Sequence, residues 1–229
     1  MLFDLEEIIK KYDLQITGVL HIGAHKCEEK EIYNKLNIKR IIWIEANPYL
    51  CNNNIYNFAA INSDIGYSTL HITNKTDSST IFDFCTHSKY YPDIFVEKNV
   101  KVKNKTIDTF YLEEKINKDY ANTLVLCIQG SELLCLKGMK KSLKNFNAIF
   151  MKVNSDFVYV NCPLIHEVEN YIKNYNFYIK ETIWTNKDWG WAFFQKINSS
   201  LPAISEKSYY KSVHPPIPSH SLSSAPHPI

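Results

Sequence analysis

The chain has 229 residues, a hydrophobic fraction of 45% and a formal net charge of +2. This length suits one α/β domain, and the apolar fraction is large enough for a sizeable core. So small a net charge does not indicate a nucleic acid or an anionic membrane as partner. The chain also has no apolar run near the roughly 18–20 residues that span a bilayer.

The N-terminal segment MLFDLEEIIKKYDL lacks the basic region and the cleavage site of a signal peptide, and it predicts a short amphipathic helix. The chain has six cysteines and no C-x-x-C pair, so no metal site is expected. Without a secretion signal, the cysteines are interpreted as reduced thiols, and we expect a cytoplasmic location.

Residues 17–48 predict a strand, a tight turn, a helix and a second strand. The apolar run 19–22 is closed by Gly23, as in a buried parallel strand that enters a turn. The second strand, 41–44, ends at Glu45, about 20 residues after the turn, where nucleotide-binding folds place an acid on ribose hydroxyls. A single glycine leaves two interpretations open, plain architecture or an adenosine-type ligand. A phosphate cradle is disfavoured because it would need more glycines.

The middle of the chain predicts strands joined in an unusual way. The apolar run 55–61 follows the second strand after only about nine residues, whereas a parallel crossover usually needs a dozen or more. Either the crossover is abbreviated or these strands pair differently. Alternation predicts further strands at 66–72 and 101–110, while 83–100 reads as a long irregular loop of the kind that often binds ligands.

The second half alternates strands with helices and ends in two apolar strands separated by a turn, which predicts an antiparallel pair. The predicted strands are 123–128, 148–153, 177–183 and 191–197, and the predicted helices are 132–143 and 164–175. The fold class expected is therefore α/β, with a mainly parallel sheet, an antiparallel C-terminal hairpin and helices on both faces. We place this domain at 1–200, followed by a flexible Pro-, Ser- and His-rich tail at 201–229.

Several runs occur in the order that is typical of one family: VLHIGAH, IIWIEANP, TIDTF, LCIQGSELLCLKGM, VNSDFVYVNCPLIHEVENYIKNYNF and WTNKDWGWAFF. Over roughly residues 15–197 the chain resembles the FkbM-type methyltransferases. The resemblance implies a Rossmann-like fold that binds S-adenosylmethionine and transfers its methyl group to an oxygen, commonly a sugar hydroxyl. It therefore implies S-adenosylmethionine as cofactor and a small-molecule or glycan acceptor as partner.

The resemblance also implies roles for individual residues. Gly23, Ala24 and His25 would line the methionine end of the cofactor, and Glu45 would hold its ribose. The remaining residues implied in cofactor binding are His21, Asn47, Gln129 and, near the adenine, Asn62, Ser63 and Asp64. The residues implied at the reacting centre are His87, Cys127 and Lys152, and those implied in acceptor binding are Glu132, Asn154 and Trp191.

Three of these positions depart from the family pattern. Cys127 and Trp191 stand where the family has Asp, and Lys152 stands where it has Glu. Mg²⁺ usually needs one or two carboxylates, and an ammonium about 4 Å away would repel each unit of its charge by roughly 4 kcal/mol. Two interpretations follow: an O-methyltransferase with impaired chemistry, or a degenerate homologue with a binding or structural role. A third interpretation, methylation of a nucleic acid, has less support, because the sequence has no basic stripe with interleaved aromatic residues.

Overall fold

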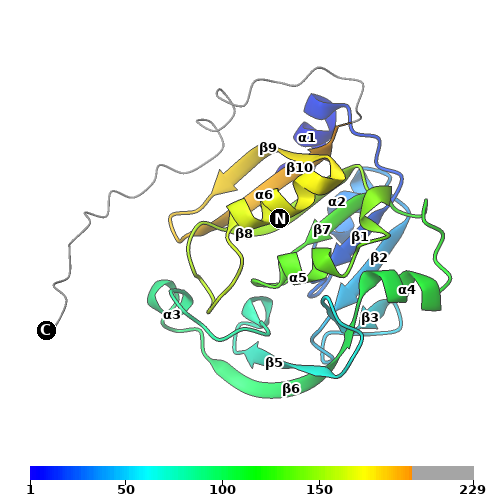
Figure 1. Ribbon diagram of the computed structural model, residues 1–229. Helices are drawn as coiled ribbons and strands as arrows, with labels where there is room; N and C mark the ends of the chain where they lie inside the picture. Colours follow the sequence, from blue (N-terminus) through cyan, green and yellow to red (C-terminus); the bar gives the residue numbers. More distant parts are fainter. Residues whose placement is uncertain (198–229) are drawn as a thin grey trace, which may run out of the picture.

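The structure, a computed structural model, describes residues 1–197 and is built on a seven-stranded sheet in the order β3-β2-β1-β7-β8-β10-β9 (Figure 1). The strands of this central sheet are β1 (Val19–Ile22), β2 (Ile41–Glu45), β3 (Ile55–Asn57), β7 (Thr123–Leu126), β8 (Ala148–Asn154), β9 (Phe177–Trp184) and β10 (Trp189–Lys196). The tail predicted at 201–229 lies outside the described residues.

Strand direction confirms the predicted fold class. Strands β3, β2, β1, β7 and β8 pair in parallel, and β10 is antiparallel to both of its neighbours, β8 and β9. The last strand of the chain therefore lies inside the sheet, and β9 forms the edge. The antiparallel C-terminal hairpin predicted from the sequence is therefore confirmed, and it forms this edge of the sheet.

Helices cover both faces of the central sheet, as expected (Figure 1). Helices α1 (Leu5–Tyr12) and α2 (Lys30–Lys35) share one apolar cluster with the sheet, and α4 (Ile107–Glu113), α5 (Glu132–Lys137) and α6 (Ile165–Ile172) share the other. All four side chains of β1 and all four of β7 are buried. Within residues 1–197, no helix is long and apolar enough to cross a membrane.

A second, three-stranded sheet lies beside the C-terminal ends of the central strands and is inserted between β3 and α4 (Figure 1). It consists of β4 (Ala59–Ala60), β6 (Val96–Lys105) and β5 (Tyr67–Thr73), in that order. The short helices η1 (Thr76–Ser78) and α3 (His87–Tyr90) connect β5 to β6. We call residues 59–105 the insert.

In this region one predicted strand is corrected, and one of the two alternatives for the crossover is confirmed. The single strand expected at 55–61 breaks at the buried Phe58, so that β3 joins the central sheet and β4 joins the insert. The connection from β2 to β3 is abbreviated and contains no helix, yet the two strands still pair in parallel.

Further corrections concern the strand expected at 101–110 and the loop expected at 83–100. Strand β6 already begins at Val96, and α3 also interrupts the expected loop. The strand ends at Lys105, because Thr106 caps α4 through a hydrogen bond from the backbone N–H of Thr109 at 3.1 Å. The helix expected at 132–143 is also shorter, since α5 ends before Gly138, and the 3-10 turn η2 (Leu143–Asn145) follows separately.

Asp64 fastens the insert to α4. Its carboxylate accepts hydrogen bonds from the backbone N–H of Thr106 at 2.7 Å and from the hydroxyls of Thr106 and Thr109 at 3.3 and 2.9 Å. Partial burial would raise the pKa of Asp64, but these hydrogen bonds outweigh it and lower the pKa below its ordinary value.

We therefore expect Asp64→Ala to reduce the free energy of unfolding by about 1 kcal/mol at pH 7, as measured by urea denaturation. The stabilisation is complete above the pKa of the unfolded chain and is lost as the pH falls through the lowered folded pKa, so the difference should close in acid. The exposed Asp93 serves as control, and Asp93→Ala should change stability by less than about 0.5 kcal/mol. Equal effects of the two substitutions would contradict this role.

Candidate functional site

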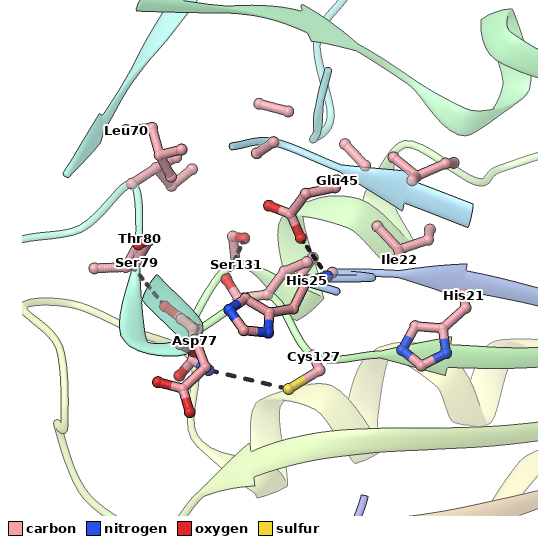
Figure 2. Close-up of a pocket in the computed structure, with 18 of the residues that line it drawn as sticks. His21, Ile22, His25, Glu45, Leu70, Asp77, Ser79, Thr80, Cys127 and Ser131 are labelled. Atoms are coloured by element: carbon pink, nitrogen blue, oxygen red, sulfur yellow. Dashed lines mark hydrogen bonds between the residues drawn. The ribbon is translucent and has the colours of Figure 1, made fainter. Parts of the chain in front are cut away.

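A cavity of about 320 Å³, which we call the central pocket, lies between the insert and the C-terminal ends of β1, β2 and β7. Figure 2 shows Glu45, His25 and Cys127 facing Leu70 and Thr80 of the insert across this space. Ligand sites usually measure about 300–1,000 Å³, and open α/β sheets bind ligands at the carboxyl ends of their strands. Both the size and the place therefore suit a small-molecule ligand.

The turn after β1 has a conformation that only glycine adopts easily at its first position. Gly23 has φ +85°, and a Cβ there would lie 2.1 Å from the carbonyl oxygen of Cys127. Two residues later, His25 is also left-handed, with φ +47°. This geometry points the backbone N–H of His25 at the end of β2, where it meets Glu45 (Figure 2).

The Glu45 carboxylate is fixed in the pocket wall by two backbone groups. One oxygen accepts from the N–H of His25 and the other from the N–H of Asn47, both at 2.8 Å. Burial raises the pKa of Glu45, although these N–H groups oppose the rise. Because each carboxylate oxygen has a further acceptor site, a rigid pair of acceptors remains for neighbouring hydroxyls of a ligand.

The lining of the central pocket is acidic. Glu28, Glu29, Glu45 and Asp77 contribute to it, and no Lys or Arg of the described chain does. The amino group of Met1 pairs with Glu29 at 2.9 Å and Nδ1 of His25 with Glu28 at 2.5 Å, which leaves Glu45 and Asp77 without a basic partner in the lining. The pocket therefore favours a ligand that carries positive charge.

His21 forms part of the floor as a neutral imidazole. The ring is completely buried, and its Nδ1 lies 3.0 Å from the hydroxyl of Tyr33. Burial lowers the pKa of His21 to about 4, which outweighs the opposing effect of Glu29. His21 therefore adds no charge to the pocket at pH 7.

The insert loop, residues 76–80, is fastened over the pocket from both sides. The Nε2 of His25 lies 2.8 Å from the hydroxyl of Thr76, and the side-chain amide of Gln129 donates to the carbonyl of Asp77 at 2.7 Å. The hydroxyl of Thr80 donates to the carbonyl of Gln129 at 2.7 Å. Like His25, Gln129 has a left-handed backbone conformation, with φ +51°. The two residues that hold the insert loop therefore both have sparsely populated backbone conformations.

Cys127 lines the pocket, whereas Lys152 lies behind Gln129 and does not. Burial raises the pKa of the Cys127 thiol to about 11, so the thiol is neutral at pH 7. The amine of Lys152 donates to Oε1 of Gln129, which also accepts from the hydroxyl of Tyr159 at 2.6 Å. The amine lies 4.6 Å from the ring centre of Trp189, so an amide oxygen and an aromatic face take the place of a carboxylate partner.

His87 lies on the same side of Gln129 as Lys152, in an aromatic cluster. Its ring stacks on Phe84 with centres 4.2 Å apart, and burial lowers its pKa to about 4, with a further contribution from Lys152. Nδ1 of His87 and Oδ1 of Asn154 are both buried, and neither has a hydrogen-bond partner among residues 1–197. Polar groups thus gather beyond Gln129, outside the lining of the central pocket.

Two of the residues predicted to bind the acceptor, Glu132 and Trp191, have structural positions. Glu132 is buried and accepts from the backbone N–H groups of Ile128 and Gly130, each at 3.0 Å, so it holds the turn between β7 and α5. Trp191 packs in the apolar core beneath α1. The predicted residues that do not line the central pocket are Ala24, Asn47, Asn62, Ser63, Asp64, His87, Glu132, Lys152, Asn154 and Trp191.

The pocket brings together six of the predicted residues: His21, Gly23, His25, Glu45, Cys127 and Gln129. Sequence reasoning missed the insert loop, which contributes Thr76, Asp77, Ser79 and Thr80, and the apolar wall, which includes Phe58 and Leu70. The hydroxyl and acidic side chains of NKTDSST could have indicated a binding loop. Local sequence patterns do not show, however, on which side of the sheet the insert lies.

The burial of Lys152 gives a testable consequence. Burial lowers the pKa of its amine below 10.5, so burying this amine destabilises the folded state at pH values below 10.5. We expect Lys152→Met to raise the free energy of unfolding by about 1 kcal/mol at pH 7. The advantage should shrink as the pH rises from the lowered folded pKa towards 10.5, because the wild-type amine is then neutral when folded.

Urea denaturation of both proteins across this pH range measures the difference. The exposed Lys137 serves as control, since Lys137→Met should leave stability nearly constant with pH. A loss of stability in Lys152→Met at every pH would show instead that the bond to Gln129 outweighs the burial of charge.

Comparisons with known proteins identify the family of this chain. The family model for the methyltransferase FkbM domain matches residues 21–179. One similar solved structure is Streptococcus pneumoniae Sp1610, described as "a putative tRNA (m1A22) methyltransferase", with 10% identity, a TM-score of 0.42, and coverage of 89% of this chain and 74% of that one. A search of the curated proteins finds no match. Since the family model covers more than half of the sequence, from the end of β1 into β9, the chain belongs to the FkbM methyltransferase family.

Proposed function

We propose that the central pocket binds S-adenosylmethionine and that the protein transfers methyl groups to the hydroxyl of a sugar or a similar small acceptor, with impaired chemistry. The observation that carries the cofactor assignment is the Glu45 carboxylate, fixed by two backbone N–H groups so that it can accept both ribose hydroxyls. Membership of the methyltransferase family supports the same reading.

The remaining lining fits the other parts of this cofactor. Phe58, Ala59, Ala60 and Leu70 provide an apolar wall for a purine ring, and the carboxylates suit a ligand with sulfonium and ammonium charges. Lys152, which would oppose a sulfonium if it lined the pocket, is separated from it by Gln129. We therefore expect cofactor binding to survive the substitution of a Lys for the family acid.

When bound, the cofactor would supply an electrophilic methyl group, and the protein must then orient the acceptor oxygen and receive its proton. Two of the residues predicted at the reacting centre are poor acceptors for this proton at pH 7. The Cys127 thiol is neutral, with a pKa raised to about 11 by burial, and the pKa of His87 is lowered to about 4. We infer that positioning remains while proton transfer is weak.

One observation favours a second reading, a degenerate methyltransferase fold that binds the cofactor without turning it over. Two of the three departures have structural roles: the amine of Lys152 is held by Gln129 and Trp189, and the indole of Trp191 packs in the apolar core. A cytoplasmic location and the lack of a nucleic-acid partner stay predictions under both readings.

The cofactor assignment predicts a specific loss of affinity. Hydrogen bonds to a charged group are worth about 1.5–3 kcal/mol, so Glu45→Ala should weaken binding of S-adenosylmethionine and S-adenosylhomocysteine by roughly tenfold or more. Isothermal titration calorimetry measures both ligands. Glu31→Ala removes an exposed acid of α2 that does not line the pocket and should bind like the wild type. Unchanged affinity in a folded Glu45→Ala protein would refute the assignment.

The reading of impaired chemistry predicts the outcome of restoring two acids. The double change Cys127→Asp, Lys152→Glu should raise methyl transfer to a panel of sugar acceptors by about a hundredfold, the usual scale of a general base. Trp191 is left in place because it packs in the core. The control Cys127→Ser, Lys152→Met alters the same positions without acids and should gain nothing, while retained affinity for S-adenosylhomocysteine reports an intact fold.

Release of S-adenosylhomocysteine measures turnover in each protein. Robust turnover by the wild type would overturn the reading of impaired chemistry. No turnover by the wild type or by the double variant, with cofactor binding intact in both, would favour the degenerate reading.

A further inference from the structure

A second cavity, of about 720 Å³, is separate from the central pocket and shares no lining residue with it. It lies at the β3 edge of the central sheet, where α2, the N-terminal half of β2, and the segment after α4 meet. The central pocket uses the C-terminal ends of the strands, so the two cavities occupy opposite ends of β2. We call the second cavity the edge groove.

The edge groove has a basic rim. Lys30, Lys39 and Lys115 contribute to it and are exposed, and no Asp or Glu of the described chain lines it. None of these three amines has an ion-pair partner among residues 1–197. Since their charges are not neutralised within the protein, they are free to pair with anionic groups of a ligand.

The rest of the lining suits rings that carry hydroxyl groups. Asn34, Asn53 and Asn117 place side-chain amides, each a donor and an acceptor, around the rim. Tyr56 and Tyr120, which are 40% and 36% exposed, offer flat amphipathic rings above a floor of buried apolar side chains. Amide groups beside part-exposed aromatic rings can hold the hydroxyls and the apolar faces of a sugar.

We infer that the edge groove binds an anionic sugar chain, one that carries carboxylate or sulfate groups. The lysine amines would pair with the acidic groups, the asparagines with the hydroxyls and the tyrosines with the ring faces. A nucleic acid is disfavoured because the net charge of the chain is only +2. This inference does not depend on the identity of the ligand in the central pocket.

The test measures binding of a sulfated, heparin-type hexasaccharide to the full chain by calorimetry at low salt. The triple variant Lys30→Gln, Lys39→Gln, Lys115→Gln should lose at least about tenfold in affinity, and wild-type binding should weaken as salt rises. The matched control is Lys101→Gln, Lys137→Gln, Lys140→Gln, which removes the same charge from exposed lysines outside both cavities and should bind like the wild type.

Three further measurements separate the sources of binding. Tyr120→Ala should weaken the hexasaccharide severalfold and leave the affinity for inorganic sulfate unchanged, because only a sugar presents a ring face. A neutral hexasaccharide should bind at least about tenfold more weakly than the sulfated one. An equal loss in both triple variants, or tighter binding of a single-stranded oligonucleotide of matched charge, would overturn the proposal.

Intact binding of S-adenosylhomocysteine in the groove variants shows that they are folded. If neither the wild type nor the variants bind that ligand, circular dichroism replaces it as the measure of folding. The result for the edge groove is then still valid.

Discussion

The side chain of Gln129 is the contact on which the site depends. Its Oε1 accepts from Lys152 and Tyr159, its Nε2 donates to the carbonyl of Asp77, and its own carbonyl accepts from Thr80. One amide therefore joins the end of β7 to β8 and to the insert. Without this side chain, the insert loop would be held over the central pocket by the bond from Thr80 to the backbone carbonyl of Gln129, by the His25–Thr76 contact and by the strand pairing of the insert.

The same contact explains how a lysine persists where the family has an acid. A buried ammonium needs an acceptor, and the amide oxygen of Gln129 together with the face of Trp189 supplies one without a carboxylate. Gln129 also separates this amine from the acidic central pocket. Under the proposed function, the half of the site assigned to the cofactor has the fixed carboxylate of Glu45, and the half assigned to the acceptor is a packed cluster of aromatic side chains around Lys152.

The sequence predicted most of the central sheet, because continuous apolar runs ended by glycine or an acid mark buried parallel strands. It also predicted the turn at Gly23 and the acid at Glu45, since spacing within one β-α-β unit fixes both. It did not predict the insert, where Thr106 turns an apparently continuous strand into a helix cap and where pairing joins segments distant in sequence. The side-chain positions of Glu132 and Trp191 were not predicted for a related reason. A motif identifies the end of a strand but not the direction in which a side chain points.

The central claim is that a family pocket for S-adenosylmethionine persists beside an acceptor site that has lost its acids. The most direct test is a crystal structure of the protein with S-adenosylhomocysteine. The account predicts the ribose hydroxyls within hydrogen-bond distance of Glu45, the adenine against Phe58 and Leu70, and the amine of Lys152 still bonded to Gln129. A ligand bound elsewhere, or a central pocket that stays empty at saturating concentration, would contradict it.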